Sequence, residues 1–363
     1  MTTRIRVLVV DDSRFMVGVV TSLLEKVPDL QVIGYALDGQ DAVDKAHALR
    51  PDVIIMDVVM PRMNGIEATR RIARPLGIPI IILSAYTQEG ARLTLEALEA
   101  GAVDCIAKPE GERSFSLGSA AELLVEKVRG VADRAADAPA VDTAEPGATG
   151  AAPGPVGPLA EAGQPGAAPS LATARPRPAA PAVVAIGASS GGIAALSALL
   201  PRFSPAVPYS ILVIQHFPER FTQQLAARLA SLCTIPVREA VAGERLTRAT
   251  ALVAPGGTNL EVTPGWRIRL SQGEGPAVMR PSIDVAFRSV AKVFGTAAVA
   301  VVLSGMGRDG TAGAREVHAA GGLVLVQDWR SAAAPGMPRA ALDAGVADAM
   351  LPVDRIAAYL TKG

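Results

Sequence analysis

The chain has 363 residues, half of them hydrophobic, and its 35 basic and 35 acidic residues cancel to a formal net charge of zero. This length predicts about two domains, and the balanced charge argues against binding to nucleic acid or to a charged membrane surface. No apolar run reaches the roughly 20 residues that span a bilayer, and the first residues lack the apolar core of a secretory signal, so we expect a cytoplasmic protein without membrane insertion. Cys105 and Cys233 are expected to be free thiols.

Residues 4–128 alternate short apolar runs with segments of helical spacing. Five strands are expected, at residues 6–10, 31–35, 53–56, 79–83 and 103–106. A helical segment after each strand is typical of a parallel sheet with helices on both faces. We therefore predict that residues 1–128 form a doubly wound (βα)5 domain.

Polar side chains stand at the ends of these strands. Asp11 and Asp12 follow the first strand, Asp57 the third, Ser84 the fourth and Lys108 the fifth. They should share a pocket, because the carboxyl ends of parallel strands meet at one edge of the sheet. Three carboxylates repel one another unless a hard cation lies between them, and Mg²⁺ prefers oxygen ligands. One carboxylate could then accept a phosphoryl group, with Lys108 offsetting its charge and Ser84 bonding a phosphate oxygen.

This set, with Asp57 before Val-Val-Met-Pro and Lys108 before proline, resembles the receiver domain of two-component response regulators. The resemblance implies that a histidine kinase phosphorylates Asp57. It also implies that Mg²⁺ contacts Asp12, Asp57 and the backbone carbonyl of Val59, with Asp11 acting mostly through water.

Residues 129–181 are rich in alanine, proline and glycine and contain few aliphatic side chains. Such a segment cannot bury enough apolar surface to offset the entropy of ordering it, so we predict a disordered linker. Its r.m.s. reach would be roughly 40 Å, which keeps two domains at high effective concentration. A helix over residues 120–134 is expected to precede this tether.

Residues 182–363 repeat the strand and helix alternation and are predicted to form a second doubly wound parallel-sheet domain. Strands are expected at residues 182–188, 209–215 and 297–304. Ser189 follows the first of them, His216 the second, and Asp309 lies shortly after the third. Parallel strands would bring a serine, a histidine and an aspartate to one rim of the sheet.

These three residue types suit nucleophilic catalysis. A serine hydroxyl is a weak nucleophile and needs a base such as imidazole, whose tautomer a carboxylate can fix. The chain has only three histidines, and His47 and His318 fall in helical runs, so His216 is the candidate base. We therefore predict Ser189 as nucleophile and Asp309 as the residue that orients His216.

The glycine-rich turn after residue 188 also fits a dinucleotide site or a plain βα turn with serines as helix caps. The dinucleotide site is disfavoured because no tyrosine is followed four residues later by lysine, as in short-chain dehydrogenases, and His216 stands where a ribose-binding acid belongs. Asp309 could be a helix cap only. Ser190 could compete with Ser189, although its place suits a cap or a hydrogen-bond donor better.

Six motifs resemble the catalytic domain of chemotaxis protein-glutamate methylesterases: Gly-Ala-Ser189-Ser-Gly-Gly, Gln215-His216-Phe-Pro, Ala254-Pro-Gly256, Arg280-Pro-Ser-Ile-Asp284, Ser304-Gly-Met-Gly-Arg-Asp309-Gly and Gly336-Met-Pro-Arg339. With the receiver in front, the whole chain resembles the response-regulator form of that enzyme, the CheB family. The resemblance implies Ser189, His216 and Asp309 as the catalytic residues and the backbone of Met306 near the oxyanion, and we expect Ser190 to support it.

The same resemblance implies hydrolysis of glutamyl γ-methyl esters on chemoreceptors, with glutamine deamidation open to the same chemistry. The partners would be methylated chemoreceptors and a histidine kinase, and we expect a monomer that needs Mg²⁺ only in the receiver. In the unphosphorylated state we expect the receiver to cover the rim that carries Ser189. The alternatives are a phosphorylation-dependent binding module without catalysis, or the same esterase acting outside chemotaxis.

Overall fold

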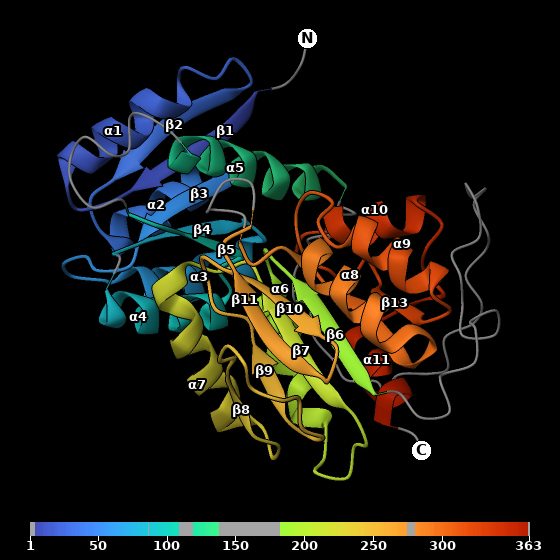
Figure 1. Ribbon diagram of the computed structural model, residues 1–363. Coiled ribbons are helices and arrows are strands. Elements are labelled where there is room, and N and C mark those ends of the chain that lie inside the picture. The colour runs from blue at the N-terminus through green and yellow to red at the C-terminus, as the bar shows by residue number, and fades with distance from the viewer. Residues whose placement is uncertain (1–3, 86, 109–118, 138–181, 274–279, 362–363) are drawn as a thin grey trace, which may run out of the picture.

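The computed structural model describes residues 4–85, 87–108, 119–137, 182–273 and 280–361. Within them lie two parallel sheets, of five and of seven strands, each with helices on both faces (Figure 1). The prediction of two α/β domains is confirmed. Most of the predicted linker, residues 138–181, lies outside the described residues. None of the described helices is both long and apolar enough to cross a bilayer.

The sheet of the N-terminal domain, called the receiver here after the family it resembles, has the strand order β2-β1-β3-β4-β5. Its strands are β1 (Ile5–Val10), β2 (Leu30–Ala36), β3 (Val53–Asp57), β4 (Ile80–Ser84) and β5 (Asp104–Ala107), and its helices are α1 (Arg14–Leu24), α2 (Gly39–Leu49), α3 (Gly65–Leu76), α4 (Gln88–Ala100) and α5 (Ser119–Asp137). Every residue of β3 and β4 is buried, as expected for strands covered on both faces. α1 and α5 cover one face, and α2, α3 and α4 cover the other.

Helix α5 continues to Asp137, past residue 128, where we placed the domain boundary. The reason is the spacing of its apolar side chains. Leu124, Val128 and Val131 are almost fully buried at positions i, i+4 and i+7, so one face of the helix expected over residues 120–134 still packs on the sheet beyond residue 128. The first part of the predicted linker is therefore helical.

The second domain has the strand order β14-β13-β12-β6-β7-β9-β8, and all its strands are parallel. Its strands are β6 (Val183–Ala188), β7 (Ser210–Gln215), β8 (Val237–Glu239), β9 (Ala251–Val253), β12 (Ala298–Val302), β13 (Leu323–Gln327) and β14 (Ala349–Leu351). A separate antiparallel hairpin, β10 (Asn259–Thr263) and β11 (Arg267–Ser271), was not among the predicted strands.

Its helices pack in two layers. On one face lie α6 (Gly192–Leu199), α7 (Thr222–Leu232) and α11 (Val353–Thr361), and on the other α8 (Ile283–Phe294), α9 (Thr311–Ala319) and α10 (Gly336–Asp343). The short 3₁₀ helices are η1 (Leu200–Arg202), η2 (Glu219–Phe221) and η4 (Gly295–Ala297). The chain runs outward in opposite directions from β6 and from its neighbour β12, and such a switch point opens a crevice at the carboxyl ends of the strands.

The receiver lies directly on the second domain. α4 contacts α6, α7 and η2, and one apolar cluster includes side chains of both domains (Figure 1). The edge of the receiver sheet also takes part, because the backbone N–H of Gly191 donates to the carbonyl oxygen of Val103 at 2.7 Å. The contact therefore falls at the start of α6, directly beside Ser189.

Candidate active site

Ser189 occupies a tight turn between β6 and α6. Its backbone N–H donates to the carbonyl oxygen of Ser304 at 2.9 Å, and its own carbonyl oxygen accepts from the N–H of Gly192 at 2.8 Å. Gly191 has φ +70°, and a Cβ there would collide with Ala333. Only glycine fits both the backbone angle and the space. The turn thus places Ser189 at the carboxyl rim of the sheet, beside the switch point.

His216 stands between Ser189 and Asp309. Its Nδ1 lies 3.2 Å from Ser189 Oγ, and its Nε2 lies 2.9 Å from Asp309 Oδ2. The side chains of His216 and Asp309 are each 14% exposed, so the chain of hydrogen bonds is largely shielded from water. With Nε2 protonated toward Asp309, Nδ1 is free to accept the serine proton. The structure therefore brings together the three residues that the strand ends indicated.

The carboxylate of Asp309 is held at the N-terminus of α8. Besides His216, it accepts hydrogen bonds from the N–H of Ile283 at 2.8 Å, the N–H of Asp284 at 2.9 Å, the N–H of Gly310 at 3.0 Å and the Ser282 hydroxyl at 3.2 Å. Burial alone would raise the pKa of Asp309, but the hydrogen bond and charge of His216 and the backbone N–H groups outweigh burial and lower it. Asp309 is therefore ionised and fixed in place at neutral pH.

Sequence reasoning missed this cradle. The sequence feature that could have revealed it is Ser282, which caps α8 by accepting a hydrogen bond from the N–H of Val285. The N–H groups of the two residues after Ser282, Ile283 and Asp284, then face Asp309. A carboxylate at a helix N-terminus is favoured by the helix dipole.

Ser190 and Met306 both meet the receiver. The Ser190 hydroxyl, 2% exposed, donates to the Asp104 carboxylate. Met306 packs against the receiver core, where a Cβ on Gly130 of α5 would collide with its Sδ. The segment that carries Met306 also adjoins the nucleophile, because a Cβ on the preceding Gly305 would lie 2.9 Å from Ser189 Cβ.

Asp104 forms a buried polar cluster with Lys127 and Ser190 that the sequence analysis did not predict. Lys127 Nζ lies 2.5 Å from Asp104 Oδ2, and the N–H of Cys105 donates to Oδ1 at 2.7 Å. Asp104 and Lys127 are only 7% and 9% exposed. The sequence feature that could have indicated this cluster is the single carboxylate in the apolar strand β5, because a buried charge requires a partner.

Little space remains between the domains at Ser189. A cavity of about 20 Å³ lies there, lined by residues of both domains, among them Asp104, Ser189 and Gln215. That volume is about the size of one water molecule. In this conformation the receiver therefore closes this side of Ser189.

The predicted phosphorylation site lies at the other switch point, between β1 and β3. Asp11, Asp12 and Asp57 each offer an oxygen within 4.8 Å of the others. Lys108 Nζ lies 2.8 Å from Asp11 Oδ2 and 3.0 Å from Asp57 Oδ1. Burial raises the pKa of Asp57, and Asp11 adds to this effect against the opposing charge of Lys108. Three carboxylates, two of them paired with Lys108, form an oxygen-only donor set that fits a hard divalent cation.

Two further predicted residues lie beside this cluster. The Ser84 hydroxyl donates to the carbonyl oxygen of Gly90 at 2.9 Å. Val59, whose carbonyl was expected to reach the metal, follows β3 and has an exposed side chain.

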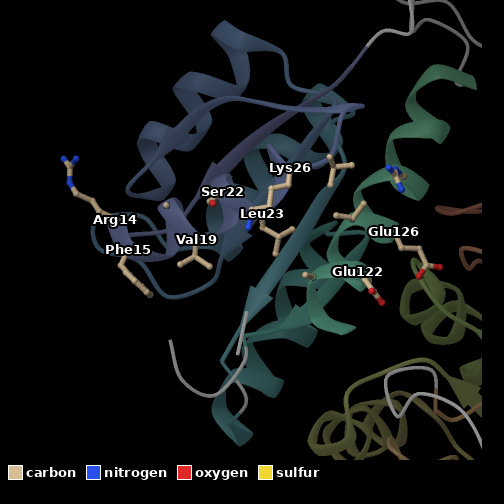
Figure 2. Close-up of a pocket in the computed structure, with 13 residues that line it drawn as sticks. Arg14, Phe15, Val19, Ser22, Leu23, Lys26, Glu122 and Glu126 are labelled. Carbon is tan, nitrogen blue, oxygen red and sulfur yellow. The ribbon is translucent and has the colours of Figure 1, made fainter. Parts of the chain in front are cut away.

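A much larger groove, of about 830 Å³, lies between α1 and α5 of the receiver (Figure 2). Apolar side chains such as Val19 and Leu23 line it together with charged ones such as Lys26 and Glu122. It contains neither the carboxylate cluster nor the Ser189 group, so cavity size does not mark the reactive sites of this protein.

Comparison with known proteins identifies both domains. A family model described as CheB methylesterase matches residues 184–360, and one described as response regulator receiver domain matches residues 7–116. A protein-glutamate methylesterase/protein-glutamine glutaminase from Symbiobacterium thermophilum is 41% identical over 359 residues, which cover 99% of this chain and 96% of that protein. One from Geobacillus kaustophilus is 39% identical over 362 residues, covering 99% and 98%.

Among solved structures, the CheB methylesterase catalytic domain of Thermotoga maritima shares 34% sequence identity with this chain. The structural alignment covers 49% of this chain and 96% of the Thermotoga maritima chain, with a TM-score of 0.48. The family resemblance read from the motifs is confirmed by the full-length relatives: the chain belongs to the CheB family of methylesterases that carry an N-terminal response regulator receiver domain.

Proposed function

We propose that this protein is a phosphorylation-regulated esterase that hydrolyses glutamyl γ-methyl esters on chemoreceptors and releases methanol. The observation that carries this proposal is the hydrogen-bonded chain from Ser189 through His216 to Asp309 at the rim of the sheet. The names of the relatives support the substrate, because those proteins are protein-glutamate methylesterases.

The geometry supports the following steps. His216 Nδ1 takes the proton of Ser189 Oγ as that oxygen attacks the ester carbonyl carbon, and Asp309 stabilises the imidazolium. The bond to the methoxy group breaks, and His216 returns the proton so that methanol leaves. Water then attacks the acyl-enzyme, again giving its proton to His216, and glutamate and the free serine result. Such a base contributes about 10²- to 10⁴-fold to the rate.

We assign the backbone N–H of Met306 as an oxyanion donor, because its segment adjoins Ser189. One such donor is worth about 10²- to 10³-fold. Ser190 would support the site once the receiver releases its hydroxyl.

The same steps with ammonia as leaving group would deamidate glutamine. The second half of the relatives' name, protein-glutamine glutaminase, favours this activity. No cofactor is needed for either reaction.

Regulation would come from the receiver. A histidine kinase would phosphorylate Asp57, with Asp11 and Asp12 helping to hold Mg²⁺. When bound, the metal would offset the charge of the transferred phosphoryl group. Phosphorylation would then weaken the docking that closes the rim beside Ser189. A coupling of about 1–3 kcal/mol corresponds to about 5- to 150-fold activation. The protein would act as a monomer in the cytoplasm.

The decisive measurement is methanol release from methylated receptor membranes by the purified full chain, with and without a small phosphodonor. We expect release that the phosphodonor increases. Ser189→Ala should abolish it, whereas the matched control Ser231→Ala, in α7, should not. Methanol release by Ser189→Ala at the parental rate would refute the assignment of Ser189 as the nucleophile.

The competing function, a binding module without catalysis, predicts no reaction with a serine-directed fluorophosphonate. Labelling of the parent chain but not of Ser189→Ala would exclude it. Activity only on receptors from another signalling array would favour the same esterase outside chemotaxis.

A further inference from the structure

Gln215, the last residue of β7, joins the nucleophile to the base. Its side-chain Nε2 donates to the carbonyl oxygen of Ser189 at 3.0 Å and to the carbonyl oxygen of His216 at 3.0 Å. The residue is 2% exposed. Both bonds lie within the catalytic domain, so they do not depend on the docked receiver.

The orientation of this amide is fixed by its partners. Both are carbonyl oxygens, which only accept hydrogen bonds, so the NH₂ group and not the oxygen must face them. Oε1 is buried and has no hydrogen-bond partner among the residues that the structure describes. It lies against α6, where a Cβ on Gly192 would be 2.5 Å from it. An unpaired buried oxygen is destabilising, which makes glutamine a poor residue for packing alone.

We propose that Gln215 is a positioning residue of the esterase, whose amide fixes the separation between Ser189 Oγ and His216 Nδ1. This inference rests on the proposed function. The two atoms are 3.2 Å apart, near the long end of hydrogen-bond range, so a small movement of either backbone would separate them. Asp309 and the α8 cradle hold only the far side of the imidazole. The amide of Gln215 ties the backbones on the near side.

The test is Gln215→Met in the full chain, measured with methylated receptor membranes and a phosphodonor. Methionine keeps the length of the side chain, removes both donors and also removes the unpaired Oε1, so the variant should fold. A misplacement of about 1 Å costs about 10²-fold, so we expect kcat to fall by about 10- to 100-fold. KM should stay within about twofold, because the lost interaction aligns the reacting groups and does not bind substrate. Ser189 labelling by a fluorophosphonate should slow by a similar factor.

Tyr209→Phe is the matched control. It removes a buried hydrogen bond at the opposite end of the same strand, from the Tyr209 hydroxyl to the carbonyl oxygen of Leu360 at 2.9 Å. It should lower the melting temperature and leave kcat unchanged. If Gln215→Met does not fold, Gln215→Leu carries the same expectation, because leucine also lacks donors and adds no buried charge.

A folded Gln215 variant with parental kcat would overturn the positioning role, and so would a loss of kcat matched by Tyr209→Phe. A parent chain that releases no methanol would instead refute the proposed function. The two failures are therefore distinguishable.

Discussion

Asp104→Asn should raise the activity of the unphosphorylated protein. The Asp104 carboxylate accepts from the Ser190 hydroxyl across the domain boundary, while Lys127 Nζ lies 2.5 Å away within the receiver. Hydrogen bonds to a charged group contribute about 1.5–3 kcal/mol and neutral ones about 0.5–1.5 kcal/mol, so the variant loses about 1–1.5 kcal/mol of docking energy. The buried ammonium of Lys127 also loses its charged partner, which acts in the same direction.

This loss predicts a specific change in rate. Under the proposed regulation, basal activity follows a small undocked fraction, and 1–1.5 kcal/mol raises that fraction by about 5- to 12-fold. The assay is methanol release without phosphodonor. With phosphodonor, the variant and the parent should reach the same maximum.

Glu99→Gln is the matched control. It breaks an ion pair between the domains, Glu99 with Arg228, whose side chains are 34% and 42% exposed. An exposed pair is worth about 0.5 kcal/mol, so basal activity should rise only about twofold. The reasoning would be refuted by a folded Asp104→Asn protein with parental basal activity, or by an equal rise in Glu99→Gln.

Three further outcomes are expected. Gly130→Ala should raise basal methanol release, because the new Cβ would collide with Met306 Sδ and weaken the docking. Alanine is the better helix former, so α5 itself should not be destabilised. Unchanged basal release would contradict the observed docking. Mg²⁺ should raise the receiver's melting temperature in calorimetry, and Asp57→Asn should weaken this effect; an equal increase in the variant would argue against the site. The pKa of Asp309 is lowered, so its carboxylate contributes stability in full above about pH 4 and loses it as pH falls further. The melting-temperature difference between the parent and Asp309→Asn should therefore shrink only below about pH 4, and shrinkage already between about pH 7 and 5 would contradict that shift.

The strand ends made the reactive groups predictable. Ser189, His216 and Asp309 are far apart along the chain, but each follows a buried apolar strand, and parallel strands with helical crossovers leave few other places for them. The same logic located Asp11 and Asp57.

What escaped prediction depends on how packed surfaces meet. Nothing in the sequence says that Nδ1 rather than Nε2 of His216 faces the serine, because that is set by where α8 places Asp309. Ser190 was expected to support the oxyanion, yet its hydroxyl donates to Asp104, a contact that forms where the two domains dock. The domain boundary was placed at residue 128 because alanine and glycine there resemble linker composition, although the helix expected over residues 120–134 already ran past it, and α5 extends to Asp137.

Strand β5 connects the carboxylate cluster of the receiver to the turn that carries Ser189 and Ser190. Asp104, its first residue, accepts a hydrogen bond from Ser190 beside the proposed nucleophile, and Lys108, just after its last residue, contacts Asp57, the proposed phosphate acceptor. Four residues of extended chain span about 13 Å. If Lys108 moved toward a phosphoryl group on Asp57, the movement would therefore reach the contact between the domains through one strand, with no helix in between.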